Sequence, residues 1–172
     1  KAEIRERIVH LRPKENLLKL LAQDASEDIF AESDLTKRLS MMEQFYSLFP
    51  PSTYANLVHQ NQLRILANDL QDLEQLREKG EMWLSDEPDN RIAHFAVGYW
   101  LTEKEVALEK AVMALKKALK LLKHPNPRDK PNNQPDREWR EDLRVTKGRY
   151  LDTLGWALYK MGNHREAEDA LQ

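Results

Sequence analysis

The chain has 172 residues, of which 41% are hydrophobic and 33% charged, with a formal net charge of −2 and no cysteine. This length and composition fit one soluble, helix-rich domain with a sizeable core. They exclude disulfides and thiolate chemistry, and no apolar run approaches the roughly 18 residues that a membrane-spanning helix needs. With only 5 glycines and 8 prolines, a turn-rich all-β fold is disfavoured.

The two ends of the sequence indicate a fragment of a longer protein. The first residue is lysine, and Gln172 follows residues that still have a helical pattern. No signal peptide is visible, although a segment removed earlier would leave no trace. The compartment is therefore undetermined, with the cytoplasm slightly favoured.

Helix pairs are predicted from the N-terminus onward. Apolar periodicity from Lys14 to Phe49 indicates one pair, and 52–86 indicates a second. Proline follows the helical runs at Pro50, Pro88 and Pro125, at intervals of 38 and 37 residues. Because proline cannot continue a helix, each one marks a helix end. A helix-turn-helix period in the high thirties is typical of solenoid proteins.

The third predicted pair begins at Asp89-Asn90, a favourable helix cap. Its first helix is predicted over 91–102 and its second over 104–122. Gly98 lies in the middle of the first helix, where glycine costs about 1 kcal/mol relative to alanine. A glycine at such a position usually has a packing reason, which we expect here. The second helix has an apolar stripe of Ala111, Leu115, Ala118 and Leu119.

An insertion is predicted at about 124–147. Four prolines, Pro125, Pro127, Pro131 and Pro135, indicate an exposed loop over 124–134. Apolar periodicity then resumes after Asp136 and continues in phase, which predicts one long helix from near Arg137 to Met161. Gly148 weakens this interpretation, and the alternative is a longer disordered linker with a stray tryptophan.

The C-terminal residues predict a last helix pair. The dipeptide Gly162-Asn163 ends the long helix, and a further apolar series follows. Gly155 lies where that second helix could approach closely. We expect Ala167 and Leu171 to be poorly covered, with a homo-oligomer contact or further helices packing there.

These patterns resemble the tetratricopeptide repeat (TPR) family, particularly its bacterial members. The family's small, apolar and proline positions are occupied in one unit by Gly98, Ala111, Leu115, Ala118 and Pro125, and in the last by Gly155, Ala167 and Leu171. Upstream the match weakens, since Arg64 and Leu76 replace the expected glycine and alanine. The resemblance implies an all-α fold, a right-handed α-solenoid of antiparallel helix pairs, as a single repeat domain over 1–172.

The resemblance also implies a non-catalytic scaffold or adaptor that binds a protein, as a peptide or a helix, in a concave groove. First-helix positions line such a groove. They are here Ile92, Phe95, Ala96, Tyr99, Thr102 and Glu103, then Arg149, Asp152, Thr153, Trp156, Tyr159 and Lys160. Phe95, Tyr99, Arg149, Asp152, Trp156 and Tyr159 are the principal predicted contacts, with the aromatic rings as anchors. Each aromatic could instead pack against the neighbouring unit or under the insertion.

Two alternatives come from other classes of function. The chain could be a regulatory or sensor domain attached to an enzyme or a transcription factor. It could also bind nucleic acid through 116–149, where 11 lysines and arginines stand against 5 acidic residues. The candidate basic patch is Arg137, Arg140, Arg144 and Lys147, spaced to share a helix face. The interleaved carboxylates and the acidic net charge make nucleic acid the less favoured partner.

Nothing in the sequence predicts an enzyme. No two of the 5 histidines lie within helical reach of each other, so no metal site is expected. The glycines are isolated, which disfavours a phosphate-binding loop. We therefore expect no cofactor, no metal and no small-molecule substrate.

Overall fold

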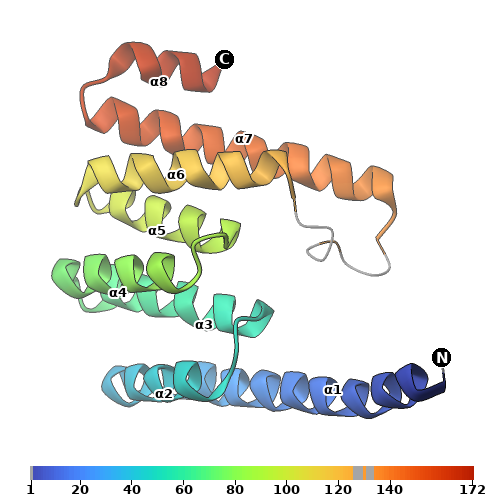
Figure 1. Cartoon of the computed structure of the whole chain (residues 1–172). Helices are drawn as coiled ribbons and strands as arrows, with labels where there is room; N and C mark the ends of the chain where they lie inside the picture. Colours follow the sequence, from blue (N-terminus) through green and yellow to red (C-terminus); the bar gives the residue numbers. More distant parts are fainter. Residues whose placement is uncertain (1, 126–129, 131–133) are drawn as a thin grey trace. The chain divides into compact units, whose positions relative to one another are not determined.

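The computed structural model describes the backbone of residues 2–125, 130 and 134–172, and side chains from residue 17 onward within these ranges. In these residues every regular element is a helix and none is a strand, which confirms the all-α class (Figure 1). The elements are α1 (Ala2–Ala31), α2 (Leu35–Leu48), α3 (Thr53–Arg64), the π-helical turn η1 (Ile65–Asp69), α4 (Leu73–Asp86), α5 (Arg91–Glu103), α6 (Leu108–Lys123), α7 (Asp136–Lys160) and α8 (His164–Leu171).

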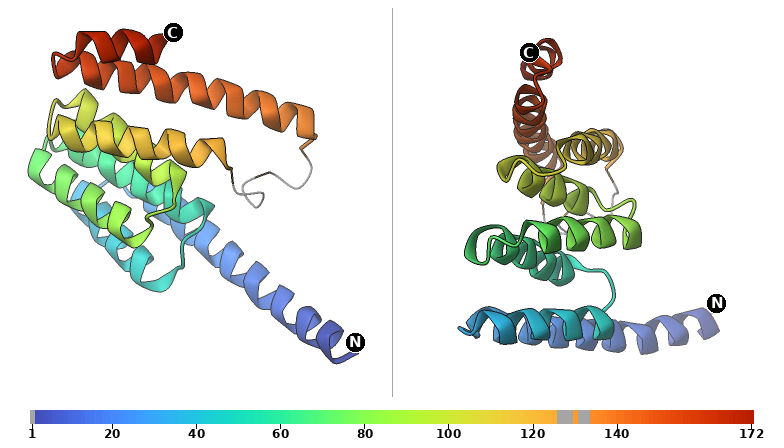
Figure 2. Two further views of the ribbon diagram at one scale, coloured as in Figure 1. Left: turned by 45° about the horizontal axis from the view of Figure 1, so that its top comes forward. Right: turned by 90° about the vertical axis from the view of Figure 1, so that its left-hand side faces the viewer.

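The chain divides into two compact units, residues 1–62 and 63–172. In the first unit α1 packs against α2. In the second unit α4 packs on α5, α5 on α6, α6 on α7 and α7 on α8, and α7 also reaches α5. Figure 2 shows the α5–α8 succession from two further sides. Packing between successive helices is thus established, while the single repeat domain and the solenoid stay predictions.

The α5 helix begins and packs as its sequence indicates. The Asn90 side chain accepts hydrogen bonds from the backbone N–H groups of Ile92 and Ala93, at 2.9 and 3.2 Å, and so caps the helix. A Cβ atom built on Gly98 would lie 2.6 Å from Leu115 Cγ of α6. The packing reason expected for Gly98 is therefore confirmed, and it is the close approach of α6.

The predicted start of the next helix at residue 104 is wrong. Helix α5 ends at Glu103 and α6 begins at Leu108, because a turn with a left-handed backbone separates them. The φ angles are +54° at Glu105 and +47° at Ala107. The Val106 N–H donates to the Leu101 carbonyl at 3.0 Å and closes this turn. Good helix formers in 104–107 hid the break from sequence reasoning.

The turn predicts a stabilising substitution. Replacing Ala107 with glycine is expected to raise the free energy of unfolding by about 1 kcal/mol, since the left-handed conformation strains an L side chain and not glycine. Thermal or urea unfolding of the two proteins measures the difference. The matched change Ala114→Gly lies inside α6 and is expected to destabilise by about 1 kcal/mol or more. A loss of stability at both positions would contradict the argument.

The long helix predicted after the insertion is confirmed as α7, of 25 residues. Its second half packs on α6, where Tyr150 joins the core with Ala118 and Leu122. Its first half extends past the end of α6 (Figure 1). Gly148 lies within the helix in open space, with nothing within 4 Å of a Cβ built on it. The predicted loop over 124–134 includes 126–129 and 131–133, which lie outside the described residues.

The C-terminal pair forms as predicted, with one correction. Gly162, with φ +80°, lies in the turn that follows α7, and α8 begins directly after Asn163. Leu171 is 60% exposed, as expected. Ala167 is 4% exposed, so the prediction that it is poorly covered is wrong. It packs in one cluster with Leu115 of α6 and Leu158 of α7.

Candidate interaction surface on α7 and α8

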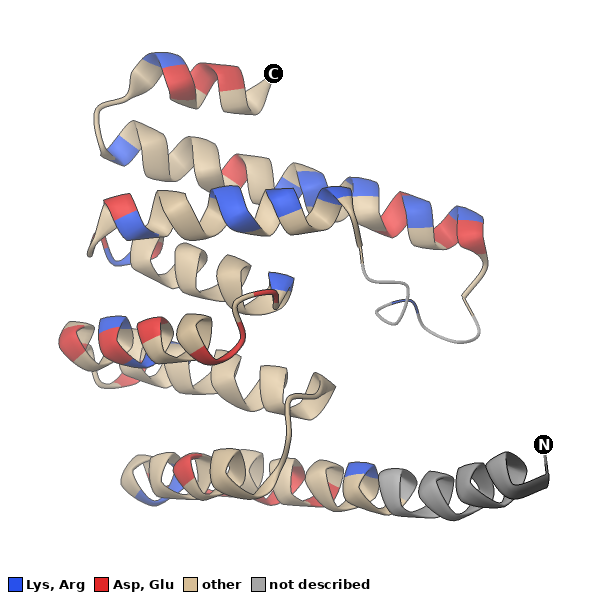
Figure 3. Cartoon of the chain, in the orientation of Figure 1, with Lys and Arg blue, Asp and Glu red and all other residues tan. Residues whose placement is uncertain are grey.

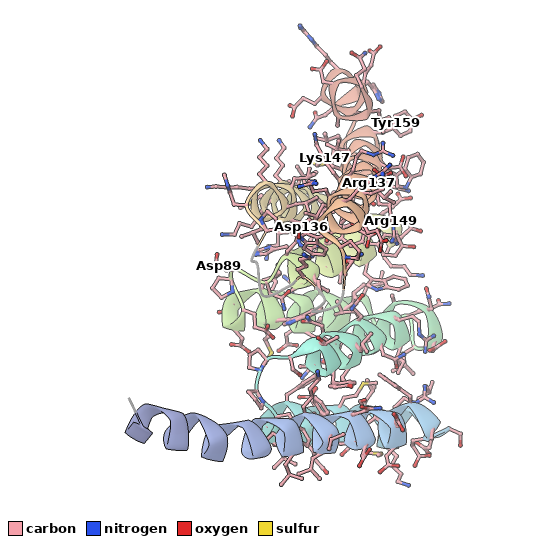
Figure 4. The ribbon with its side chains drawn as sticks, turned by 90° about the vertical axis from the view of Figure 1, so that its right-hand side faces the viewer. Asp89, Asp136, Arg137, Lys147, Arg149 and Tyr159 are labelled. Carbon is pink, nitrogen blue, oxygen red and sulfur yellow. The ribbon has the colours of Figure 1, made fainter. Side chains whose placement is uncertain are left out.

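Four of the predicted contact residues share one face of α7. Arg149, Asp152, Trp156 and Tyr159 are spaced by three or four residues, which places them along a single stripe. All four are exposed, Trp156 at 46% and Tyr159 at 54%. Figure 4 shows Arg149 and Tyr159 on the same side of α7. The structure thus brings the C-terminal half of the predicted site together on one surface.

The two exposed rings are held in place by local contacts. Trp156 and Tyr159 stack with centroids 5.5 Å apart and an interplanar angle of 7°. The Lys160 ammonium lies 4.5 Å from the centre of the Trp156 ring and forms an ion pair with Glu105 at 2.5 Å. Since the stacking and the cation–π contact restrict the rotamer of Trp156, its side chain would lose less conformational entropy when a partner binds.

A hollow of about 700 Å³ lies beside these rings, between α7 and α8. Its floor is largely apolar. Gly155 lets α8 approach α7 closely, since a Cβ atom built on Gly155 would lie 2.8 Å from Leu171 Cγ. The lining contains two carboxylates and one histidine, and no lysine or arginine. Its residues are Asp152, Gly155, Trp156, Tyr159, His164, Ala167, Glu168, Leu171 and Gln172.

The α5 half of the predicted site is placed differently. Phe95 stacks on Tyr150 of α7, with centroids 4.2 Å apart, and packs against the core clusters on α6 and α7. Tyr99 is half-buried and meets Trp100 edge to face at 5.0 Å. Ala96 is buried. The α5 aromatic residues therefore contribute mainly to packing, and the exposed aromatic surface lies on α7.

Thr102, a further position of the predicted α5 groove, is satisfied internally, and Arg91 at the start of the same helix bonds to α7. Thr102 is fully buried and its hydroxyl donates to the Gly98 carbonyl at 2.7 Å. The Arg91 Nη1 donates to the Tyr150 hydroxyl at 2.9 Å. Burial raises the pKa of Tyr150 and the neighbouring Arg91 charge opposes this rise. The Arg91–Tyr150 hydrogen bond ties α5 to α7, while the Thr102 hydroxyl is used within α5.

The predicted basic patch is exposed but mixed in charge. Arg137, Arg140, Arg144 and Lys147 all lie at the surface of the first half of α7. Arg144 is committed to Glu141 through two hydrogen bonds, of 3.0 and 2.6 Å, and the bonded arginine lowers the pKa of Glu141. Figure 3 shows acidic and basic residues alternating along this part of α7. Figure 4 places Lys147 on the opposite side of α7 from Tyr159.

The lysines of α6 are also partly compensated. Lys110, Lys116 and Lys117 form ion pairs with carboxylates of α4, α8 and the α4–α5 turn, at 2.5, 3.4 and 3.0 Å. Part of the run of basic residues that Figure 3 shows on α6 is therefore paired with acidic neighbours. A continuous field for phosphate binding does not follow from these residues.

No group of three or more potential metal ligands occurs among the described residues. In that same part of the chain, no helix is both long and apolar enough to cross a membrane. His94 is nearly buried, and its Nε2 lies 2.9 Å from the Pro88 carbonyl oxygen. Burial lowers the pKa of His94. This histidine therefore has a structural partner in the turn that precedes α5.

Sequence reasoning missed a polar cluster in the first unit. The Tyr46 hydroxyl donates to Gln62 at 3.2 Å, and Gln62 donates to Glu43 at 2.7 Å. The rings of Tyr46 and His59 stack with centroids 3.9 Å apart. Burial raises the pKa of Tyr46 well above its usual range. These residues come from two helices with no motif among them, so no sequence signal indicates the cluster.

Residues of the α7–α8 hollow were also missed in part. His164 and Glu168 line it beside the predicted Trp156 and Tyr159. The uncovered Leu171 was the available signal, since it pointed to α8.

Comparison with known proteins adds no relative: no family model matches the chain, and neither a curated protein nor a solved structure matches it.

Proposed function

We propose that this chain is a non-catalytic protein-interaction module that binds a partner protein on the exposed aromatic surface of α7. The observation that carries the proposal is the ordered pair Trp156 and Tyr159 at the edge of an apolar hollow. Large rings that are exposed, held in one orientation and placed beside a concave apolar surface are effective anchors for a partner.

The TPR-like repeat pattern supports the same proposal. Gly98 against Leu115 and Gly155 against Leu171 are two small-to-large contacts between successive helices, in the order that the repeat resemblance implies. A right-handed solenoid of such pairs, with a scaffold or adaptor role, is the architecture we propose on this basis. The proposed binding through the α7–α8 surface rests on the exposure of Trp156 and Tyr159 and does not require a solenoid.

The proposal predicts a loss of binding without a loss of folding. The double substitution Trp156→Ala/Tyr159→Ala is expected to weaken capture of protein partners from a lysate by about tenfold or more, since both rings are exposed anchors. Quantitative mass spectrometry of the captured proteins measures this loss. Circular dichroism should remain that of the parent protein.

A matched control removes apolar surface elsewhere in the same unit. Met113 is 71% exposed on α6, and Met113→Ala should leave the captured set unchanged. Partners that survive the aromatic double substitution would move the binding site to another face. Capture of nucleic acid alone would remove the main support for a protein-interaction module.

A further inference from the structure

We propose that the α7–α8 hollow receives an amphipathic helix of the partner, with aliphatic residues on one face and lysine or arginine along its edges. This inference rests on the proposed function and specifies the chemistry of the partner at the same site. Its first support is an internal precedent, and its second is the charge of the hollow.

The internal precedent is the surface formed by α5 and α6. In that pair Gly98 of α5 meets Leu115 of α6, just as Gly155 of α7 meets Leu171 of α8. Leu115 is 0% exposed, whereas Leu171 is 60% exposed. The two helix pairs therefore present equivalent contacts, of which one is covered and the other is open.

A helix provides the cover in the first pair. Leu154 and Leu158 of α7 pack with Leu115 in one buried cluster, and α7 also contacts α5. The covering residues are aliphatic and four positions apart, which is the spacing of one helix face. By analogy, an occupant of the α7–α8 hollow should be a helix with aliphatic residues at positions i and i+4.

The charge of the hollow specifies the edges of that helix. Asp152 and Glu168 line it, and Asp169 is exposed on the same helix as Glu168. The nearby Lys160 is neutralised by Glu105. Two carboxylates in the lining of the apolar hollow, with no lysine or arginine among the lining residues, favour lysine or arginine at the rim of the incoming helix and disfavour acidic residues there.

Two synthetic helical peptides of about 18 residues test this chemistry. Both carry leucine at i and i+4 along one face, and they differ only in having lysine or glutamate at the flanking positions. Fluorescence anisotropy at about 0.15 M salt measures the binding of each. The lysine peptide is expected to bind at least about tenfold more tightly than the glutamate peptide.

Variants assign the binding to the hollow. Trp156→Ala/Tyr159→Ala should weaken binding of the lysine peptide by about tenfold or more. Asp152→Asn/Glu168→Gln should remove most of the difference in affinity between the lysine and the glutamate peptides. Met113→Ala should leave the affinity for both peptides unchanged. Equal binding of the two peptides, or binding that ignores the aromatic substitution, would overturn the inference.

A second copy of this chain is the competing occupant of the hollow. Analytical ultracentrifugation of the parent protein and of Trp156→Ala/Tyr159→Ala shows whether a second copy fills the hollow. A dimer that the double substitution abolishes would replace the basic helix as the occupant. Peptide failure together with aromatic-dependent capture of other proteins would refute the helix chemistry and leave the proposed function standing.

Discussion

Replacing Gly98 with valine is expected to lower the free energy of unfolding of the second unit by about 3 kcal/mol or more. The new Cβ would lie 2.6 Å from Leu115 Cγ and 3.2 Å from the Ala111 carbonyl oxygen. Leu115 is fully buried, so its side chain cannot turn into solvent to make room. The two helices must then move apart, which opens the core on both sides of α6.

Urea unfolding followed by tryptophan fluorescence measures this loss, because all 4 tryptophans lie within residues 63–172. Gly148→Val is the matched control. It makes the same change in the middle of a helix, but nothing lies within 4 Å of the added Cβ. Its stability should stay within about 0.5 kcal/mol of the parent or rise slightly, since valine is a better helix former than glycine. Equal losses at Gly98 and Gly148 would mean that close packing is not the cause.

The contrast between these two glycines shows what local sequence signals can provide. Helix ends at Asn90 and Gly162 follow from side-chain capping and from a backbone conformation that favours glycine, and both are read within a few residues. The phase of the apolar residues likewise predicted α7 across Gly148. Sequence reasoning provided a reason to expect packing at Gly98 and a weak point at Gly148, but only the structure shows that the first glycine is required by packing and the second is merely tolerated.

The turn between α5 and α6 had no such signal. Lys104, Glu105 and Ala107 are residues that commonly continue a helix, yet the backbone is left-handed at Glu105 and Ala107. The break allows α6 to fold back on α5, where Leu115 meets Gly98. Tertiary packing therefore overrides local preference here, as it often does for single residues of moderate helix propensity.

The candidate site likewise could be predicted only where it depends on helical periodicity and not where it depends on tertiary packing. The common face of Arg149, Asp152, Trp156 and Tyr159 follows from helical periodicity, which sequence reveals. Whether a ring on α5 faces solvent depends on where α7 lies, and stacking of Phe95 on Tyr150 could not be read from spacing. The hollow required knowledge of how closely α8 approaches Gly155.

Acid is expected to destabilise the first unit through His59. Its ring lies parallel to Tyr46, with an interplanar angle of 4°. Burial lowers the pKa of His59 from 6.5 to about 4, against the opposing effect of Glu43. Because the folded state binds this proton less readily than the unfolded chain does, the stabilisation is complete above the unfolded pKa. It is lost as the pH falls from about 6.5 to about 4, and amounts to about 3 kcal/mol over the whole interval.

His59→Gln isolates this contribution, because glutamine keeps a polar side chain and does not titrate, whereas the carboxylates are the same in both proteins. Far-ultraviolet circular dichroism follows urea unfolding, since residues 1–62 contain no tryptophan. Between about pH 7 and about pH 4.5, the parent should lose about 2 kcal/mol more stability than the variant. Nuclear magnetic resonance of the His59 ring should show a pKa of about 4. A ring that titrates near its ordinary value, with equal acid losses in the two proteins, would show that the stacked imidazole accepts a proton without disturbing the fold.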